Sequence, residues 1–266
     1  MDRYPNTAVS ASQTSVLATN KVLRNTYLLL GATLAFSAVT AGVAMAINLP
    51  FMGLWMLLPY FGLVYAVNAT RNSGWGIVWT FALTGFLGLT LGPILEFYLK
   101  SVPNGAQLVM TSLGVTAASF LGLSAYAITS KKDFSFMGGF LTVGIIGAFV
   151  LSLVAVFFHL STLSLVVSGL FLLLSGGIIL YKTSEIIHGG ETNYITATVT
   201  LYVMIYNMFL SLLRLLSSRN LRVLLAGLDE REPGHVAAQD FWHDDAAVHL
   251  LIVFHYCHQR ATRRNA

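Results

Sequence analysis

Seven long apolar segments, separated by short polar connections, constrain the fold of this chain more than any other feature. Each approaches the roughly 20 apolar residues that a helix needs to cross a hydrocarbon core about 30 Å thick. They cover residues 25–47, 51–69, 74–98, 105–129, 134–158, 161–181 and 193–216. Because lipid offers no hydrogen bonds, each crossing must satisfy its own backbone. The sequence therefore predicts an all-α polytopic membrane protein, a bundle of seven transmembrane helices.

Composition agrees with lipid as the main solvent. Apolar residues make up 56% of the chain and charged residues only 10%, against about a quarter charged in soluble domains. A net charge of +4 is compatible with nucleic-acid binding. However, the basic residues are scattered between apolar segments and form no patch with aromatic residues. We therefore expect no nucleic acid as partner. A single cysteine, Cys257, excludes an intramolecular disulfide.

Polarity divides the chain into three parts. Residues 1–20 form a polar amino-terminal tail, expected to be extended or disordered and to lie in the cytosol, and the apolar segment after it is too long for a signal peptide. Residues 21–218 form the transmembrane domain. Residues 219–266 form an atypical polar carboxyl-terminal tail, whose potential zinc ligands match no zinc spacing and predict no metal site: His249, His255, Cys257 and His258.

Basic residues predict the orientation, because cytosolic connections of membrane proteins are enriched in Lys and Arg. With the amino terminus in the cytosol, Lys100 alone falls outside before the tail. The cytosolic set is Arg3, Lys21, Arg24, Arg71, Lys131, Lys132 and Lys182. Seven crossings would leave the carboxyl terminus outside, whereas the arginines after the last segment favour the inside: Arg214, Arg219 and Arg222. That conflict stays open at the level of sequence.

The third segment carries small residues on one helix face. Gly85, Gly88 and Gly92 follow at three- and four-residue spacing, which lets another helix approach closely. Pro93 removes a helix hydrogen bond and should kink the segment. The pattern favours a packing kink, and a hinge that opens a pore is the alternative.

Acidic side chains within an apolar segment are costly unless they are paired or line a cavity. Glu96 lies one turn before Lys100, which favours an interfacial ion pair. Lys182, Glu185 and His188 follow at three-residue spacing, and Glu191 comes just after Gly189 and Gly190, which should end the helix. This cluster is either a salt-linked helix end or a proton-sensitive site in which His188 changes the charge beside Glu185.

Motifs of enzymes are missing from the sequence. It contains no G-x-S-x-G elbow, no H-E-x-x-H, no phosphate-binding loop and no aspartate pair within a segment. We therefore expect a protein that is not an enzyme and uses no cofactor. Transport and interaction remain as classes of function.

Several motifs resemble the Bax-inhibitor family of membrane proteins. TGFLGLTLGPIL at 84–95 and TAASF at 116–120 look like the family signature. TSEIIHGGETNYI at 183–195, with the polar residues of the last segment, closely resembles the bacterial YccA branch. The resemblance covers about residues 20–218 and implies a Bax-inhibitor seven-helix bundle whose last helix lies near the centre. Its intramembrane polar residues Tyr202, Tyr206 and Asn207 are consistent with that position.

The resemblance implies two alternative activities. Some family members are pH-regulated calcium leak channels with an aspartate in each of the last two helices, but those positions hold Lys182 and Met204 here. Lys182 would repel calcium, so this alternative, with calcium or protons as partners, is weakened. The YccA branch modulates, and is degraded by, the membrane AAA protease FtsH, which works with HflK and HflC. We therefore expect a multi-pass modulator of FtsH in the bacterial inner membrane.

Overall fold

The computed structural model describes residues 7–51, 53–102, 104–130, 132–158 and 161–218. This part of the chain is all-helical. Its elements are α1 (Thr7–Ala46), the 3₁₀ helix η1 (Gly53–Met56), α2 (Leu57–Thr70), α3 (Trp75–Ser101), α4 (Gly105–Ser130), α5 (Met137–Phe157), α6 (Ser161–Ile187) and α7 (Tyr194–Ser217). Six of the helices are long and apolar enough to cross a membrane, and α2 is a shorter apolar helix.

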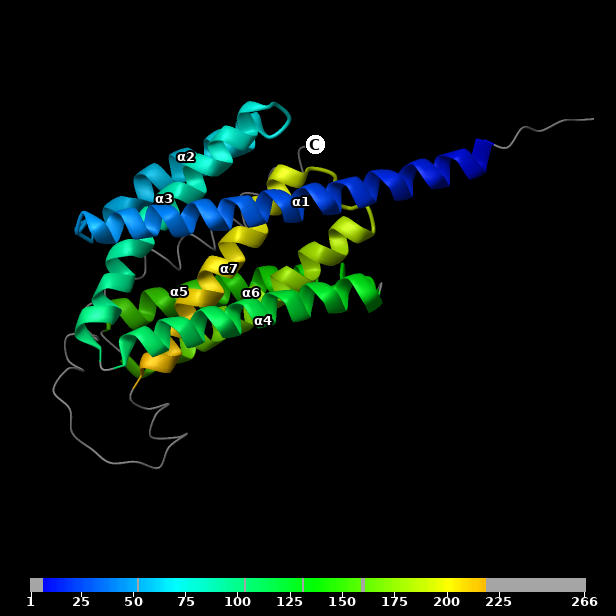
Figure 1. Cartoon of the computed structure of the whole chain (residues 1–266). Helices are drawn as coiled ribbons and strands as arrows, with labels where there is room; N and C mark the ends of the chain where they lie inside the picture. Colours follow the sequence, from blue (N-terminus) through cyan, green and yellow to red (C-terminus); the bar gives the residue numbers. More distant parts are fainter. Residues whose placement is uncertain (1–6, 52, 103, 131, 159–160, 219–266) are drawn as a thin grey trace, which may run out of the picture.

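The helix α7 lies between two groups of three helices. Figure 1 shows α1, α2 and α3 on one side of it and α4, α5 and α6 on the other. The most extensive interhelical contact joins α1 to α3, and α6 contacts both α4 and α5. Every residue from Ile195 to Leu213 except Ile205 is buried. The expected central position of the last helix is therefore confirmed.

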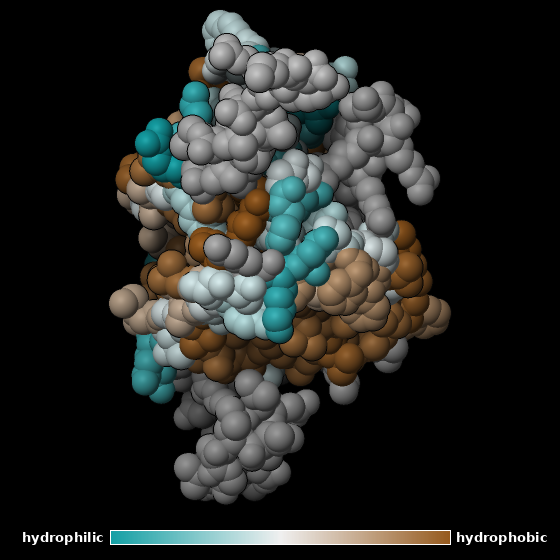
Figure 2. Space-filling model, turned by 90° about the vertical axis from the view of Figure 1, so that its right-hand side faces the viewer, coloured by the Kyte–Doolittle hydropathy of each residue, from teal (hydrophilic) through white to brown (hydrophobic). Residues whose placement is uncertain are grey.

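Large apolar side chains cover much of the outer surface. Leu58, Phe140 and Leu173 are 68%, 72% and 74% exposed, and Figure 2 shows brown hydrophobic surface along the lower and right edges of the molecule. Water would penalise such a continuous apolar surface, whereas hydrocarbon tails would not. This distribution is the one expected of helices surrounded by lipid.

The glycine face of α3 packs against α1. A Cβ atom added at Gly88 would overlap the Thr40 hydroxyl and the Ser37 carbonyl, and one at Gly85 would lie 2.6 Å from the Phe36 ring. At Gly92 it would overlap the side chain of Ala44. The prediction of a close-packing face is confirmed. Pro93 lies inside α3, which continues to Ser101.

Two boundaries differ from the sequence prediction, and a third agrees with it. Residues 7–20 were expected to be extended or disordered, but they continue α1 as a helix, because no proline or glycine interrupts the chain between Thr7 and Lys21. The second helix begins at Leu57 and not near residue 51, because Asn48 and Gly53 adopt positive φ and Pro50 lies between them. The sixth helix continues through its charged last turns to Ile187, just before the glycine pair predicted to end it, since those charges are paired within the protein.

Candidate functional site

Lys182 is a buried cation held between two carboxylates. Its side chain is 3% exposed, and its Nζ atom lies 2.5 Å from Glu191 Oε2 and 3.2 Å from Glu185 Oε2. The side chains of Glu185 and Glu191 are 9% and 8% exposed. The Tyr181 hydroxyl donates a hydrogen bond of 3.2 Å to the second oxygen of Glu185. The ammonium group of Lys182 therefore bridges two buried carboxylates and compensates one of their two charges, as charges removed from water require partners.

A tight reversal of the chain brings Glu191 back toward α6. The carbonyl oxygen of Glu185 accepts hydrogen bonds from the amides of Gly190 and Glu191, at 2.9 and 3.2 Å. Gly189 has a φ of 75°, a conformation that glycine adopts without strain. The predicted helix end at the glycine pair is confirmed. The reversal lets two acids that are six positions apart in sequence meet the same ammonium group.

Asn193 links this turn to the connection between α2 and α3. Its side-chain oxygen accepts from the amides of Ile195 and Thr196 and so caps the start of α7. Its amide nitrogen donates to the Arg71 carbonyl at 2.9 Å and to the Asn72 side chain at 3.0 Å. Glu191 adds a bond by accepting from the Asn193 backbone amide at 3.0 Å.

Ser184 links the same end of α6 to the connection between α4 and α5. Its hydroxyl donates to the Lys132 carbonyl at 3.1 Å and accepts from the Phe134 amide at 3.1 Å. Three connections therefore meet at one end of the bundle. We call this end, formed by residues 71–74, 132–136 and 188–193, the charged end. Figure 2 views the molecule from the side on which the α6–α7 connection lies in Figure 1, with hydrophilic side chains in the middle of the face.

His188 is an exposed residue just after α6, in contact with Ser184. Its Nδ1 atom lies 2.8 Å from the Ser184 carbonyl oxygen, so Nδ1 is the protonated, donating nitrogen. Hydrogen bonds from the Ser135 hydroxyl and amide, together with the nearby imidazole of His188, hold the pKa of Asp133 below its usual value. The expected charge coupling between His188 and Glu185 stays a prediction.

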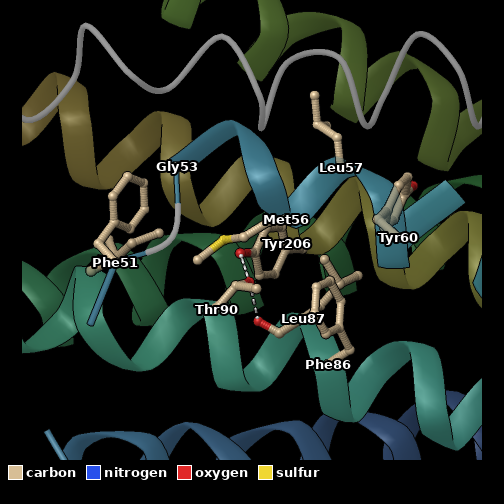
Figure 3. Close-up of a pocket in the computed structure, with 10 residues that line it drawn as sticks. Phe51, Gly53, Met56, Leu57, Tyr60, Phe86, Leu87, Thr90 and Tyr206 are labelled. Atoms are coloured by element: carbon tan, nitrogen blue, oxygen red, sulfur yellow. Dashed lines mark hydrogen bonds between the residues drawn. The ribbon is translucent and has the colours of Figure 1, made fainter. Parts of the chain in front are cut away.

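Tyr202 and Tyr206 connect α7 to α1 and α3. The Tyr202 hydroxyl lies 2.5 Å from Ser37 Oγ and donates to the Thr84 carbonyl at 3.3 Å. The Tyr206 hydroxyl lies 3.0 Å from Thr90 Oγ1, beside a small, mainly apolar cavity with room for about one water molecule. Figure 3 shows this pair of hydroxyls with residues of η1 and α2 above them and α3 below.

Two further candidates, Asn207 and Glu96, form their bonds within their own helices. Asn207, almost fully buried in α7, donates to the Val203 carbonyl at 2.8 Å. Glu96 accepts from Lys100 at 2.5 Å, with the lysine side chain 67% exposed. The predicted ion pair of α3 is therefore confirmed, and neither residue belongs to the Lys182 cluster.

Comparison with known proteins identifies the family of this chain. Residues 19–220 match the family model described as inhibitor of apoptosis-promoting Bax1. The chain belongs to this Bax-inhibitor family. It is 48% identical over 217 residues to the Escherichia coli K12 protein named modulator of FtsH protease YccA, with 81% of this chain and 97% of that protein covered. A second Escherichia coli protein at the same identity and coverage is named inner membrane protein YccA.

A further Bax-inhibitor relative, from Pseudomonas aeruginosa, is 51% identical over 195 residues, covering 73% of this chain and 87% of its own length, and its name gives no activity. The names of these relatives describe a modulator and a membrane protein, and none describes an enzyme.

The Bax-inhibitor positions expected to hold aspartates are both buried here. Lys182 is paired as described above, and Met204 is fully buried in the apolar core. Among the residues that the structure describes, no group of three His, Cys, Asp or Glu side chains could hold a metal ion. The tail ligands considered for zinc, His249 to His258, lie outside the described residues.

Sequence reasoning missed several residues that hold the site together. Ser184 and Asn193 join the connections at the charged end, and Ser37 and Thr90 receive the two tyrosine hydroxyls. Only Asn193 carried a local signal, since an asparagine just before a helical segment is a preferred N-cap. The others act across helices far apart in sequence.

Proposed function

We propose that this chain is a non-catalytic inner-membrane protein that binds and modulates the membrane protease FtsH and is itself a substrate of it. The observation that carries the proposal is the 48% identity to the Escherichia coli modulator of FtsH, which extends over 97% of that protein. The family resemblance adds HflK and HflC as partners of the same complex. Lipid is the solvent of the helices on this proposal, in agreement with their exposed apolar side chains.

We propose seven crossings with the amino terminus in the cytosol. Asn193 at the start of α7 contacts Arg71 at the end of α2, so α2 must return across the bundle to the charged end. Its 14 residues extend about 21 Å, and the four residues of η1 add about 8 Å. Together they approach the thickness of the hydrocarbon core. The charged end carries Arg71 and Lys132, and Lys21 lies at the start of the first span, which supports a cytosolic location for this end.

The three proposed parts of the chain have different roles. Residues 21–218 form the transmembrane domain, and residues 1–20 form the cytosolic amino-terminal segment. The helix α1 begins at Thr7, and its membrane-spanning part begins at Lys21. Residues 7–20 would then extend about 21 Å beyond the bundle, where an ATP-driven protease has access to the chain. Residues 219–266, proposed as a separate polar tail, lie outside the described residues.

The experiment that tests this proposal is a pulse-chase measurement of protein lifetime. Deleting residues 2–15 should lengthen the lifetime of the protein in cells that contain FtsH and should have no effect in cells that lack it. Lys100→Gln, a change at the opposite end, is the matched control and should leave the lifetime unchanged. Equal degradation of the full-length and shortened chains would count against the proposal, as would failure of the full chain to co-purify with FtsH.

A pH-sensitive calcium or cation leak is the alternative function. Lys182 counts against it, because its ammonium group already occupies the point where Glu185 and Glu191 converge. Liposomes that contain the purified protein should therefore pass no more calcium than empty liposomes at any pH between about 6 and 7. Calcium entry that changes over this range, and that Glu185→Gln or His188→Ala alters, would favour the leak.

A further inference from the structure

The described cations of this protein fall into two groups that differ in pairing. Lys182 is bound to two carboxylates, Lys100 is bound to Glu96, and Arg214 contacts Ser164. Four others form no ion pair with any residue that the structure describes: Lys21, Arg24, Arg71 and Lys132. Three of these are exposed and Arg71 is partly exposed. All four lie at or near the charged end.

Carboxylates at the charged end offset only part of this positive charge. Glu185 and Glu191 are buried and already bound to Lys182. Among the described residues of this end, Asp133 is the exposed carboxylate. It accepts hydrogen bonds from the amide and hydroxyl of Ser135. The end of the bundle therefore presents a positive surface at the boundary of its apolar helices.

Three of the four cations are followed by a highly exposed apolar side chain four positions later in the sequence. The pairs are Arg24 with Leu28, Arg71 with Trp75, and Lys132 with Phe136. The three apolar side chains are 67%, 65% and 79% exposed, respectively. On α1 this spacing places Arg24 and Leu28 on the same helix face. In the other two pairs the cation lies in a connection, and the exposed apolar side chain lies where the next helix begins: Trp75 is the first residue of α3, and Phe136 directly precedes α5.

We propose that these three pairs bind anionic phospholipids, with the cation on the headgroup phosphate and the apolar side chain on the acyl chain. A free phosphate has no apolar part that could contact the apolar side chain of each pair. The lipid surface attracts basic residues electrostatically, and each one contributes about fivefold to affinity. Aromatic side chains such as Trp75 are favoured at the depth of the headgroups.

Native mass spectrometry of the full chain, released from nanodiscs of equal phosphatidylglycerol and phosphatidylethanolamine, tests this proposal. The ratio of retained anionic to zwitterionic lipid should fall about fivefold in the variant Arg24→Gln, Arg71→Gln, Lys132→Gln, because each of the three sites loses its one cation. Lys100→Gln removes a paired cation at the opposite end and should change the ratio by less than about twofold. If the triple variant does not fold, Arg24→Gln alone should lower the ratio by about a quarter, because one of the three sites is weakened about fivefold and two remain.

Three results would overturn the proposal. The first is an unchanged ratio in the triple variant, and the second is an equal fall with Lys100→Gln, which would indicate a general effect of charge. The third is displacement of the lipid by soluble glycerophosphoglycerol, which would show that the acyl chain contributes nothing. A co-purifying protein that replaces the lipid, and that the triple variant loses, would show that the surface serves a protein partner.

Discussion

Replacing Lys182 with methionine should strongly destabilise the charged end. The substitution keeps an unbranched apolar stem of similar length and removes only the ammonium group. Two carboxylates, 9% and 8% exposed, would then face each other without a cation, and Glu191 would lose its contact of 2.5 Å. Removing one partner of a buried ion pair costs about 3–5 kcal/mol, because the remaining charge is left uncompensated.

The assay is thermal unfolding in detergent, followed by the fluorescence of the tryptophans. In a domain of this size, about 1 kcal/mol shifts the midpoint by about 2–4 °C, so Lys182→Met should lower it by about 6–20 °C. Glu191→Gln should cost less, because Lys182 keeps Glu185 as partner. The triple change Lys182→Met, Glu185→Gln, Glu191→Gln should recover much of the loss, since it leaves no charge in the site. A midpoint for Lys182→Met equal to that of the wild type would refute this reasoning.

Three further predictions concern packing, capping and acid stability. Gly88→Leu should disrupt the contact between α1 and α3 and lower the unfolding midpoint, whereas Gly114→Leu, where a Cβ meets no atom within 4 Å, should leave it unchanged. Asn193→Ala should cost about 0.5–2 kcal/mol through loss of the α7 cap, measured in the same assay, and protease cleavage should increase in the connection between α2 and α3. Because its folded pKa is lowered, Asp133 stabilises the fold above its ordinary pKa and loses this effect as the pH falls below it. In Asp133→Asn the unfolding midpoint should therefore fall less steeply than in the wild type as the pH is lowered. An equally steep fall in both proteins would contradict this prediction.

The features that the sequence predicted correctly depend on residues that are close together in the chain. Apolar length located the helices, and small residues at helical spacing located the close contact of α3. The ion pair of Glu96 and Lys100 lies within one helix, so spacing alone indicated it. The wrong expectation of an extended segment before residue 21 arose from polarity, which says little about helix formation in a segment without glycine or proline.

The candidate site depended on contacts that spacing does not encode. The sequence placed Lys182, Glu185 and His188 together because they repeat every three residues, but the structure selects Glu191 as the closest acid of Lys182. A reversal at Gly189 creates that contact. Likewise, nothing local indicates that Tyr202 meets Ser37, which is 165 positions away.

By itself, the sequence determined that this chain is a set of apolar helices, because the need to satisfy the backbone within lipid leaves few other structures. It also indicated the family, through the motif that surrounds Glu185. Tertiary packing alone decided which connections meet at the charged end and which acids share Lys182. The physical reason is that helix formation depends on neighbouring residues, whereas the pairing of buried charges depends on which helices lie side by side.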